Sequence, residues 1–175
     1  MRSHITPPPW LLKLGVPADC ISQSSSASEN QRSFSIRPES GDVIWRVKTD
    51  DCWFSSSNLK KVDYLFWVSS SSGSRLVLLV ELKGKDFGTA LQQIEASLQH
   101  LCKLTDGQGI HTGEHRLSPG HDRHDQAGVR AYVILSKGKG VPQRQIERAR
   151  LSKRYGVIVY PQSQRLEVKG VDALP

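Results

Sequence analysis

The sequence predicts an α/β protein with a central mixed sheet and flanking helices. Two strongly apolar runs stand on either side of five small polar residues at 70–74, a pattern typical of a buried β-hairpin. A segment with apolar residues at helical spacing follows at 86–105. Strand-like and helix-like segments then alternate up to residue 170, which indicates helices packed against a sheet.

Length and composition limit the class of protein. The chain has 175 residues, which suits one domain of ordinary size. It contains no run of about 20 apolar residues, so we expect no transmembrane segment. Prolines at 7–9 and 17 interrupt the apolar patch near the N-terminus, where a secretory signal needs a continuous one. We therefore expect a cytoplasmic protein that does not bind membranes.

The three cysteines, Cys20, Cys52 and Cys102, are odd in number and show no C-x-x-C spacing. This pattern indicates neither a disulfide framework nor a cysteine zinc site. We expect them to be reduced, partly buried thiols.

Residues 1–33 are expected to form an irregular N-terminal arm, because they contain a triple proline and the Ser-rich run 22–30. A single domain is expected over residues 34–175, with a long polar loop at 105–128. Its first strand is indicated at 43–47, where apolar residues alternate. Later strands are expected at 129–136, 156–160 and 165–170, with a helix at 141–155.

The hairpin has a register that follows from the sequence. If it is symmetric about Ser72, apolar residues face one another along both strands: Tyr64 with Val80, Leu65 with Leu79, Phe66 with Leu78, Trp67 with Val77 and Val68 with Leu76. Such strands belong in the middle of a sheet that is covered on both faces. The same register places Asp63 opposite Glu81, with Lys83 two residues further on the same face.

This convergence of two carboxylates and an ammonium group suits the hydrolysis of phosphodiesters. Carboxylate oxygens hold Mg²⁺ or Mn²⁺, which stabilises charge on the phosphate and activates water, and a nearby lysine orients or deprotonates that water. The alternative is structural: Glu81 and Lys83 form an ordinary charge pair at the strand end, and Asp63 caps the neighbouring strand. The pairing favours a metal site, because adjacent carboxylates repel unless a cation compensates them.

The segments 62–66 and 79–84, followed by a helix that carries glutamines, resemble the PD-(D/E)xK nuclease superfamily. The resemblance implies an αβββαβ restriction-endonuclease-like core and metal-dependent cleavage of nucleic acid, DNA in particular. It implies that Asp63 and Glu81 hold the metal with help from the Leu82 carbonyl, and that Lys83 acts on the attacking water.

Many members of that superfamily carry a glutamine on the following helix. Gln93 matches it better than Gln92, because Gln93 shares a helical stripe with Ser97. The chain departs from the family pattern at Val62, which stands where the motif has proline. The acidic residue of the family's N-terminal helix has three candidates here, which are Glu29, Glu39 and Asp42.

The charge distribution favours a polyanionic partner. The chain has 24 Lys and Arg residues against 17 Asp and Glu residues, a net charge of +7, and most of the excess lies between residues 137 and 154. A solvated helix face is the alternative explanation. The residues expected to contact nucleic acid are Lys61, Lys85, Lys137, Lys139, Arg144 and Arg148.

Other functions stay open at this stage. A non-catalytic module that binds nucleic acid or protein would use the same fold without chemistry. Histidines at 111, 115, 121 and 124 would allow a zinc site, although glycine and proline among them favour a flexible polar loop. A homodimer and an RNA substrate are further alternatives.

Overall fold

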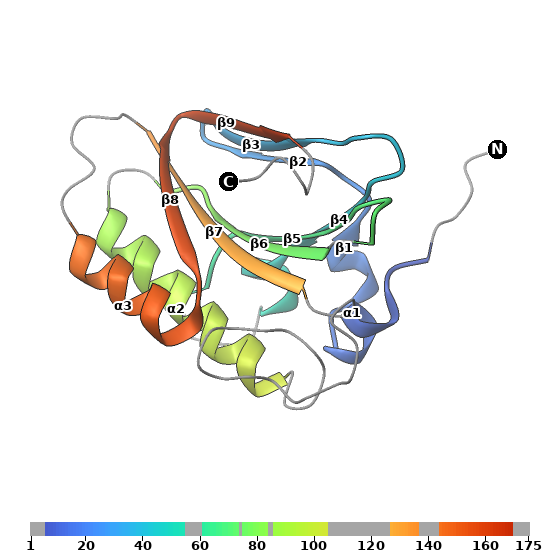
Figure 1. Cartoon of the computed structure of the whole chain (residues 1–175), viewed down its shortest axis with the longest axis horizontal. Helices are drawn as coiled ribbons and strands as arrows, with labels where there is room; N and C mark the ends of the chain where they lie inside the picture. Colours follow the sequence, from blue (N-terminus) through green and yellow to red (C-terminus); the bar gives the residue numbers. More distant parts are fainter. Residues whose placement is uncertain are drawn as a thin grey trace.

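The computed structural model describes residues 6–54, 61–73, 75–83, 86–104, 127–136 and 144–169. Three layers make up the fold. A six-stranded mixed sheet lies between a layer of helices and a smaller three-stranded sheet (Figure 1). The expected α/β class with a central mixed sheet is confirmed.

The six-stranded sheet has the order β1-β4-β5-β6-β7-β8. Pairing is antiparallel from β1 to β6 and parallel from β6 to β8. The strands are β1 (Ile21–Ser22), β4 (Val43–Lys48), β5 (Tyr64–Ser69), β6 (Arg75–Glu81), β7 (Ala127–Leu135) and β8 (Ile158–Ser163). The later strands lie close to their expected positions, with ends that differ by a few residues.

The hairpin of β5 and β6 has the predicted register, with Tyr64 opposite Val80 and Val68 opposite Leu76. Both strands are central and are covered on both faces. Leu65 and Leu79 face the helices, whereas Phe66 and Leu78 face the small sheet. Buried apolar side chains on both faces explain why these strands show no alternation of polar residues.

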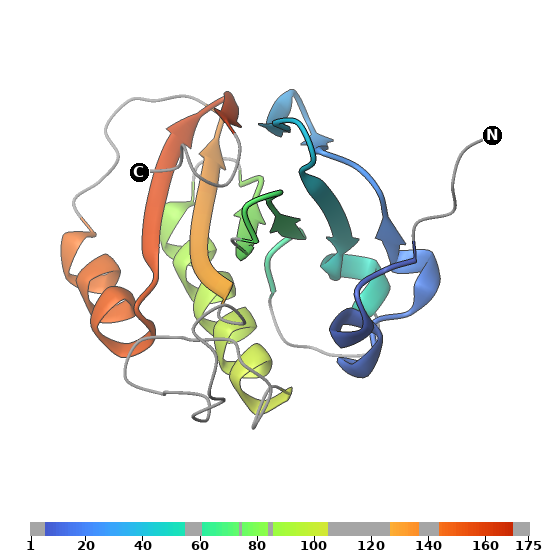
Figure 2. The ribbon, with the colours of Figure 1, turned by 45° about the vertical axis from the view of Figure 1, so that its right-hand side comes forward.

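The helices α1 (Pro9–Lys13), α2 (Phe87–Leu104) and α3 (Gln145–Tyr155) cover one face of this sheet. Figure 2 shows α2 and α3 side by side, where α2 packs against β6 and β7. The expected helical spacing gives α2 a buried apolar stripe, which includes Phe87, Leu91, Ile94 and Leu98. Among the helices of the described residues, none has the length and hydropathy to span a bilayer.

The small sheet corrects the expectation of an irregular N-terminal arm. Its strands are β2 (Ser26–Glu29), β3 (Arg32–Arg37) and β9 (Arg165–Lys169), so strands occupy much of the second half of residues 1–33. A two-residue turn at Asn30 and Gln31, both with positive φ, joins β2 to β3. The Ser-rich sequence of β2 does not indicate a strand, because only Ala27 is buried there. Phe34 and Ile36 of the neighbouring strand β3 supply core side chains of the small sheet.

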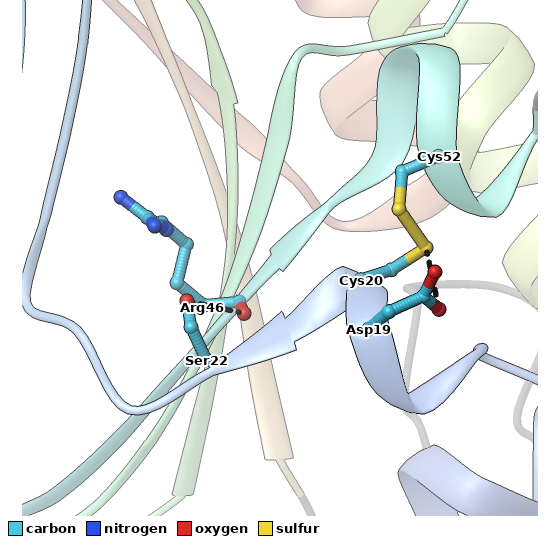
Figure 3. Close-up of a disulfide and its surroundings, with 5 residues drawn as sticks. All are labelled: Asp19, Cys20, Ser22, Arg46 and Cys52. Carbon is cyan, nitrogen blue, oxygen red and sulfur yellow. Dashed lines mark hydrogen bonds between the residues drawn. A yellow bond between two sulfur atoms is a disulfide. The ribbon is translucent and has the colours of Figure 1, made fainter.

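A disulfide corrects the expectation of three reduced cysteines. It joins Cys20 at the end of the turn η1 (Ala18–Cys20) to Cys52 in the turn η2 (Thr49–Trp53), 32 residues away (Figure 3). Antiparallel pairing of β1 with β4 brings the two turns together. Disulfides are typical of oxidising compartments. Cys102 is half-buried and lies outside this disulfide.

Candidate active site

The candidate site lies where β5 begins and β6 ends. Asp63 directly precedes β5 and Glu81 is the last residue of β6, so antiparallel pairing sets them at the same edge of the sheet. The turn η2 supports this edge, because the Thr49 N–H donates to the Asp63 carbonyl over 3.1 Å and the Thr49 hydroxyl donates to the Val62 carbonyl. These bonds fix the backbone of the segment that places Asp63 opposite Glu81, as the sequence predicted.

Reciprocal hydrogen bonds hold the two carboxylates. The Asp63 N–H donates to Glu81 Oε2 over 3.2 Å, and the Leu82 N–H donates to Asp63 Oδ2 over 2.6 Å. Glu81 is only 1% exposed, whereas Asp63 is partly exposed. One carboxylate is therefore buried at the base of the site, and the other lies closer to solvent.

Lys83 joins the pair as predicted from the strand alternation. Its Nζ lies 3.6 Å from Glu81 Oε1, and its side chain is 32% exposed. The ammonium group therefore contacts the buried carboxylate and is still accessible to solvent.

Gln93 of α2 supports Glu81 from the helix layer. Its Nε2 donates to the Lys61 carbonyl over 2.6 Å and approaches Glu81 Oε2 at 3.3 Å. Gln93 is 7% exposed, while Gln92 faces solvent, as the helical stripe predicted. Within the described part of the chain, Gln93 Oε1 is buried without a hydrogen-bond partner. The Ser97 hydroxyl donates to the Gln93 carbonyl and accepts from the Val62 N–H, which ties α2 to the strand entry.

The environment favours the protonated form of both acids. Burial raises the pKa of Glu81 to about 8, and the charge of Asp63 adds to this increase. Burial also raises the pKa of Asp63 to about 6, with further increases from Glu29 and Asp50. Lys83 opposes both shifts but does not cancel them. Two acids whose pKa values are raised by burial and by nearby charge at one site are typical of a functional position.

The sequence offered three candidates for a third acidic residue beside Asp63 and Glu81, and the structure excludes two of them. Glu29 lies at the end of β2, and its charge raises the pKa of Asp63, so it lies near Asp63 and Glu81. Glu39 and Asp42 form the turn before β4, which begins opposite Ser69 at the other end of the sheet. Their position rules them out as partners of Asp63.

Asp50 is a nearby acid that the sequence reasoning missed. It lies in η2, two residues beyond the end of β4, and its charge raises the pKa of Asp63. A signal was present, because a strand antiparallel to β5 must end where β5 begins, and the two aspartates 50–51 follow that strand.

The residues predicted to bind nucleic acid have mixed positions. Lys61 is buried, and its Nζ lies 3.5 Å from the centroid of the Phe54 ring, which favours packing over phosphate contact. Arg144 is exposed and pairs with Glu147 at 3.3 Å, and Arg148 donates to the Val159 carbonyl over 2.8 Å. Lys85, Lys137 and Lys139 lie outside the described residues, as does the histidine-rich loop.

Two further cations of the basic segment have a structural role. Arg150 and Arg154 of α3 both pair with Glu95 of α2, at 2.6 and 3.5 Å. They therefore link the two helices, and their charges are partly compensated. Within the described residues 144–154, the positive charges therefore do not form one continuous unpaired surface.

A second group of potential ligand atoms lies at the disulfide. Asp19, Cys20 and Cys52 bring three such atoms within 4.8 Å of one another (Figure 3). The cysteine sulfurs are bonded to each other, so they are not available as thiolate ligands. This group therefore offers no metal site in the oxidised protein.

Comparison with family models, with curated proteins and with solved structures gives no match for this chain. The chemical interpretation therefore rests on the geometry of the site and on the short motifs around Asp63, Glu81 and Lys83.

Proposed function

We propose that this protein is a divalent-metal-dependent nuclease that hydrolyses phosphodiester bonds, with DNA as the first substrate to test. The observation that carries the proposal is the convergence of Asp63, Glu81 and Lys83 at one edge of the sheet, where the Asp63 N–H donates to Glu81, the Leu82 N–H donates to Asp63, and Lys83 contacts Glu81. The order β4, β5, β6, α2, β7 supports the resemblance to the PD-(D/E)xK superfamily. In this order the aspartate of the motif, Asp63, precedes β5, and its second acid and lysine, Glu81 and Lys83, lie at the end of β6.

The residues present fit a hard divalent cation. Asp63 and Glu81 offer carboxylate oxygens, the type of ligand that Mg²⁺ and Mn²⁺ prefer, and Glu29 and Asp50 add negative charge nearby. Their raised pKa values mean that metal binding would displace protons that the buried pair otherwise retains. When bound, such an ion stabilises charge on the phosphate and lowers the pKa of water.

The chain's own residues have separate roles in this proposal. Lys83 reaches solvent from its contact with Glu81, so its ammonium group can orient the attacking water through a hydrogen bond. Gln93 is a positioning residue, because its amide holds Glu81 Oε2. The Leu82 N–H holds Asp63, and a role for the Leu82 carbonyl as a ligand stays a prediction.

The test is cleavage of plasmid and of short single-stranded and duplex DNA with Mg²⁺ or Mn²⁺. We expect nicked or shortened products that disappear with EDTA and in Asp63→Asn and Lys83→Ala. Asp42→Asn is the matched control, since Asp42 lies at the opposite end of the sheet. Cleavage that persists in Asp63→Asn would remove this residue from the mechanism. Salt-sensitive binding with no product under any metal would favour the non-catalytic module.

A further inference from the structure

A cleft opens at the same end of the molecule as the acidic pair. The strands β6, β7 and β8 are parallel, and Glu81 lies opposite Val133, so their carboxyl ends share one edge. The chain leaves β8 at this edge through Gln164, whose N–H donates to the Leu135 carbonyl over 2.7 Å. Arg165 follows and pairs with Ser33 at the start of β3.

The walls of this cleft are the turn between β2 and β3 and the first residue of β9. Residues 28–33 and Arg165 line a volume of about 330 Å³. The lining is polar, with two guanidinium groups, one carboxylate, two amides and two hydroxyls, and it has no aromatic ring on which a base would stack. These groups suit a ligand that is anionic and rich in hydrogen-bond acceptors.

The cleft lies close to the strand ends that carry the acidic pair. Phe34, the residue after Ser33 of the cleft, packs with its ring centroid 5.2 Å from that of Tyr132 in β7, and Tyr132 pairs with Val80, the residue before Glu81. Glu29 lines the cleft opposite Arg32. In the helix layer, Arg144 lies against the first turn of α2, where a Cβ on Gly88 would come within 2.6 Å of the Arg144 Cζ. The small sheet and the helix layer therefore each contribute a guanidinium group, Arg165 in the cleft and Arg144 at the start of α2.

We propose that this cleft binds the sugar-phosphate backbone of the substrate strand beside the bond that is cut, with Arg165 as the phosphate contact. The inference rests on the proposed nuclease function and names where its substrate lies. Arg165 is exposed and Arg32 is buried, with its Nε 3.3 Å from the Glu29 carbonyl, so Arg32 is part of the wall and Arg165 is the group that reaches a ligand. A strand from this cleft toward Arg144 would cross Asp63, Glu81 and Lys83.

The experiment compares Arg165→Ala with Lys169→Ala. Both residues are exposed cations of β9, but Lys169 pairs with Arg37 at the end of the strand far from the cleft. Each change is made in a Lys83→Ala background to prevent turnover. Binding of fluorescein-labelled single-stranded and duplex DNA is then measured by anisotropy at several salt concentrations.

We expect Arg165→Ala to weaken binding about tenfold, as the loss of one charge-assisted contact implies. The slope of log affinity against log salt should fall by about 1. Lys169→Ala should change neither value, and Mn²⁺ binding should be the same in both variants. Equal effects of the two substitutions, or no effect of either, would overturn the inference.

The result also separates the cleft from the chemistry. Asp63-dependent cleavage with unchanged affinity in Arg165→Ala overturns the cleft and leaves the nuclease standing. Arg165-dependent binding by a protein that cleaves nothing supports the cleft and counts against the nuclease.

Discussion

Glu81 should make the metal-free protein less stable as the pH rises. Its pKa is about 8 in the folded chain, against an ordinary value of 4.5, because burial and Asp63 disfavour the anion. Between these values the unfolded chain has released the proton while the folded chain retains it, so stability falls with increasing pH. Above about pH 8 both states are ionised at this residue and the loss is complete.

The size of the loss follows from this window. Each pH unit between 6 and 8 lowers the free energy of unfolding by about 1.4 kcal/mol, so the total between pH 6 and pH 9 is about 2 to 3 kcal/mol. Asp63 adds little above pH 6, because its own pKa is about 6. The Glu81→Gln variant has no proton to lose and should lack most of this decline.

Urea unfolding at pH 6 and pH 9 measures the effect, with EDTA in one series and excess Mg²⁺ in another. In EDTA, wild type should lose more stability than Glu81→Gln by the amount given above. Mg²⁺ should restore wild type at pH 9, because an ion that binds only the folded state stabilises it, and it should not restore Glu81→Gln. An equal decline in the two proteins in EDTA would refute the electrostatic reasoning.

Three further predictions concern other parts of the structure. Gln93→Leu should lower Mn²⁺ affinity or cleavage rate by about tenfold, as loss of an outer ligand partner does, while Gln92→Leu at the exposed neighbouring position should change neither; equal effects would contradict the role of Gln93. Reduction of the Cys20–Cys52 bond, which closes a loop of 32 residues, should lower the free energy of unfolding by about 3 to 4 kcal/mol in urea. If the reductant destabilises the Cys102→Ser variant by the same amount and has no effect on the Cys52→Ser variant, the change is assigned to this bond. Phe34→Ala should cost about 3 to 5 kcal/mol in the same assay, because Phe34 is fully buried between the sheets, and a cost below about 1 kcal/mol would contradict the packing of the small sheet.

The sequence predicts the part of the fold in which local pattern and burial agree. The apolar pairs around Ser72 specify one register, because a shift by one residue would move every side chain to the other face of the sheet. That register alone places Asp63 opposite Glu81. The helical stripe likewise distinguishes buried Gln93 from exposed Gln92.

Features that depend on tertiary contacts escaped prediction. The Ser-rich strand β2 has low strand propensity and forms because β3 and the core beneath it accept Ala27. The bond between Cys20 and Cys52 depends on the pairing of β1 with β4. The strand β1 has only two residues, which is too short for a sequence pattern to predict this pairing. Asp50 lies in a turn with no regular period, and only the antiparallel pairing of β4 with β5 indicates that this turn lies beside the start of β5, where Asp63 is.

The central claim is that Asp63 and Glu81 together hold one divalent cation. Titration of Mn²⁺ into the protein at neutral pH, followed by calorimetry, tests it without reference to any substrate. We expect a single site in wild type and in Asp42→Asn, with protons released on binding, and no binding in Asp63→Asn or Glu81→Gln. A Mn²⁺ site of unchanged affinity in both of the latter variants, or no binding by wild type at all, would contradict the claim.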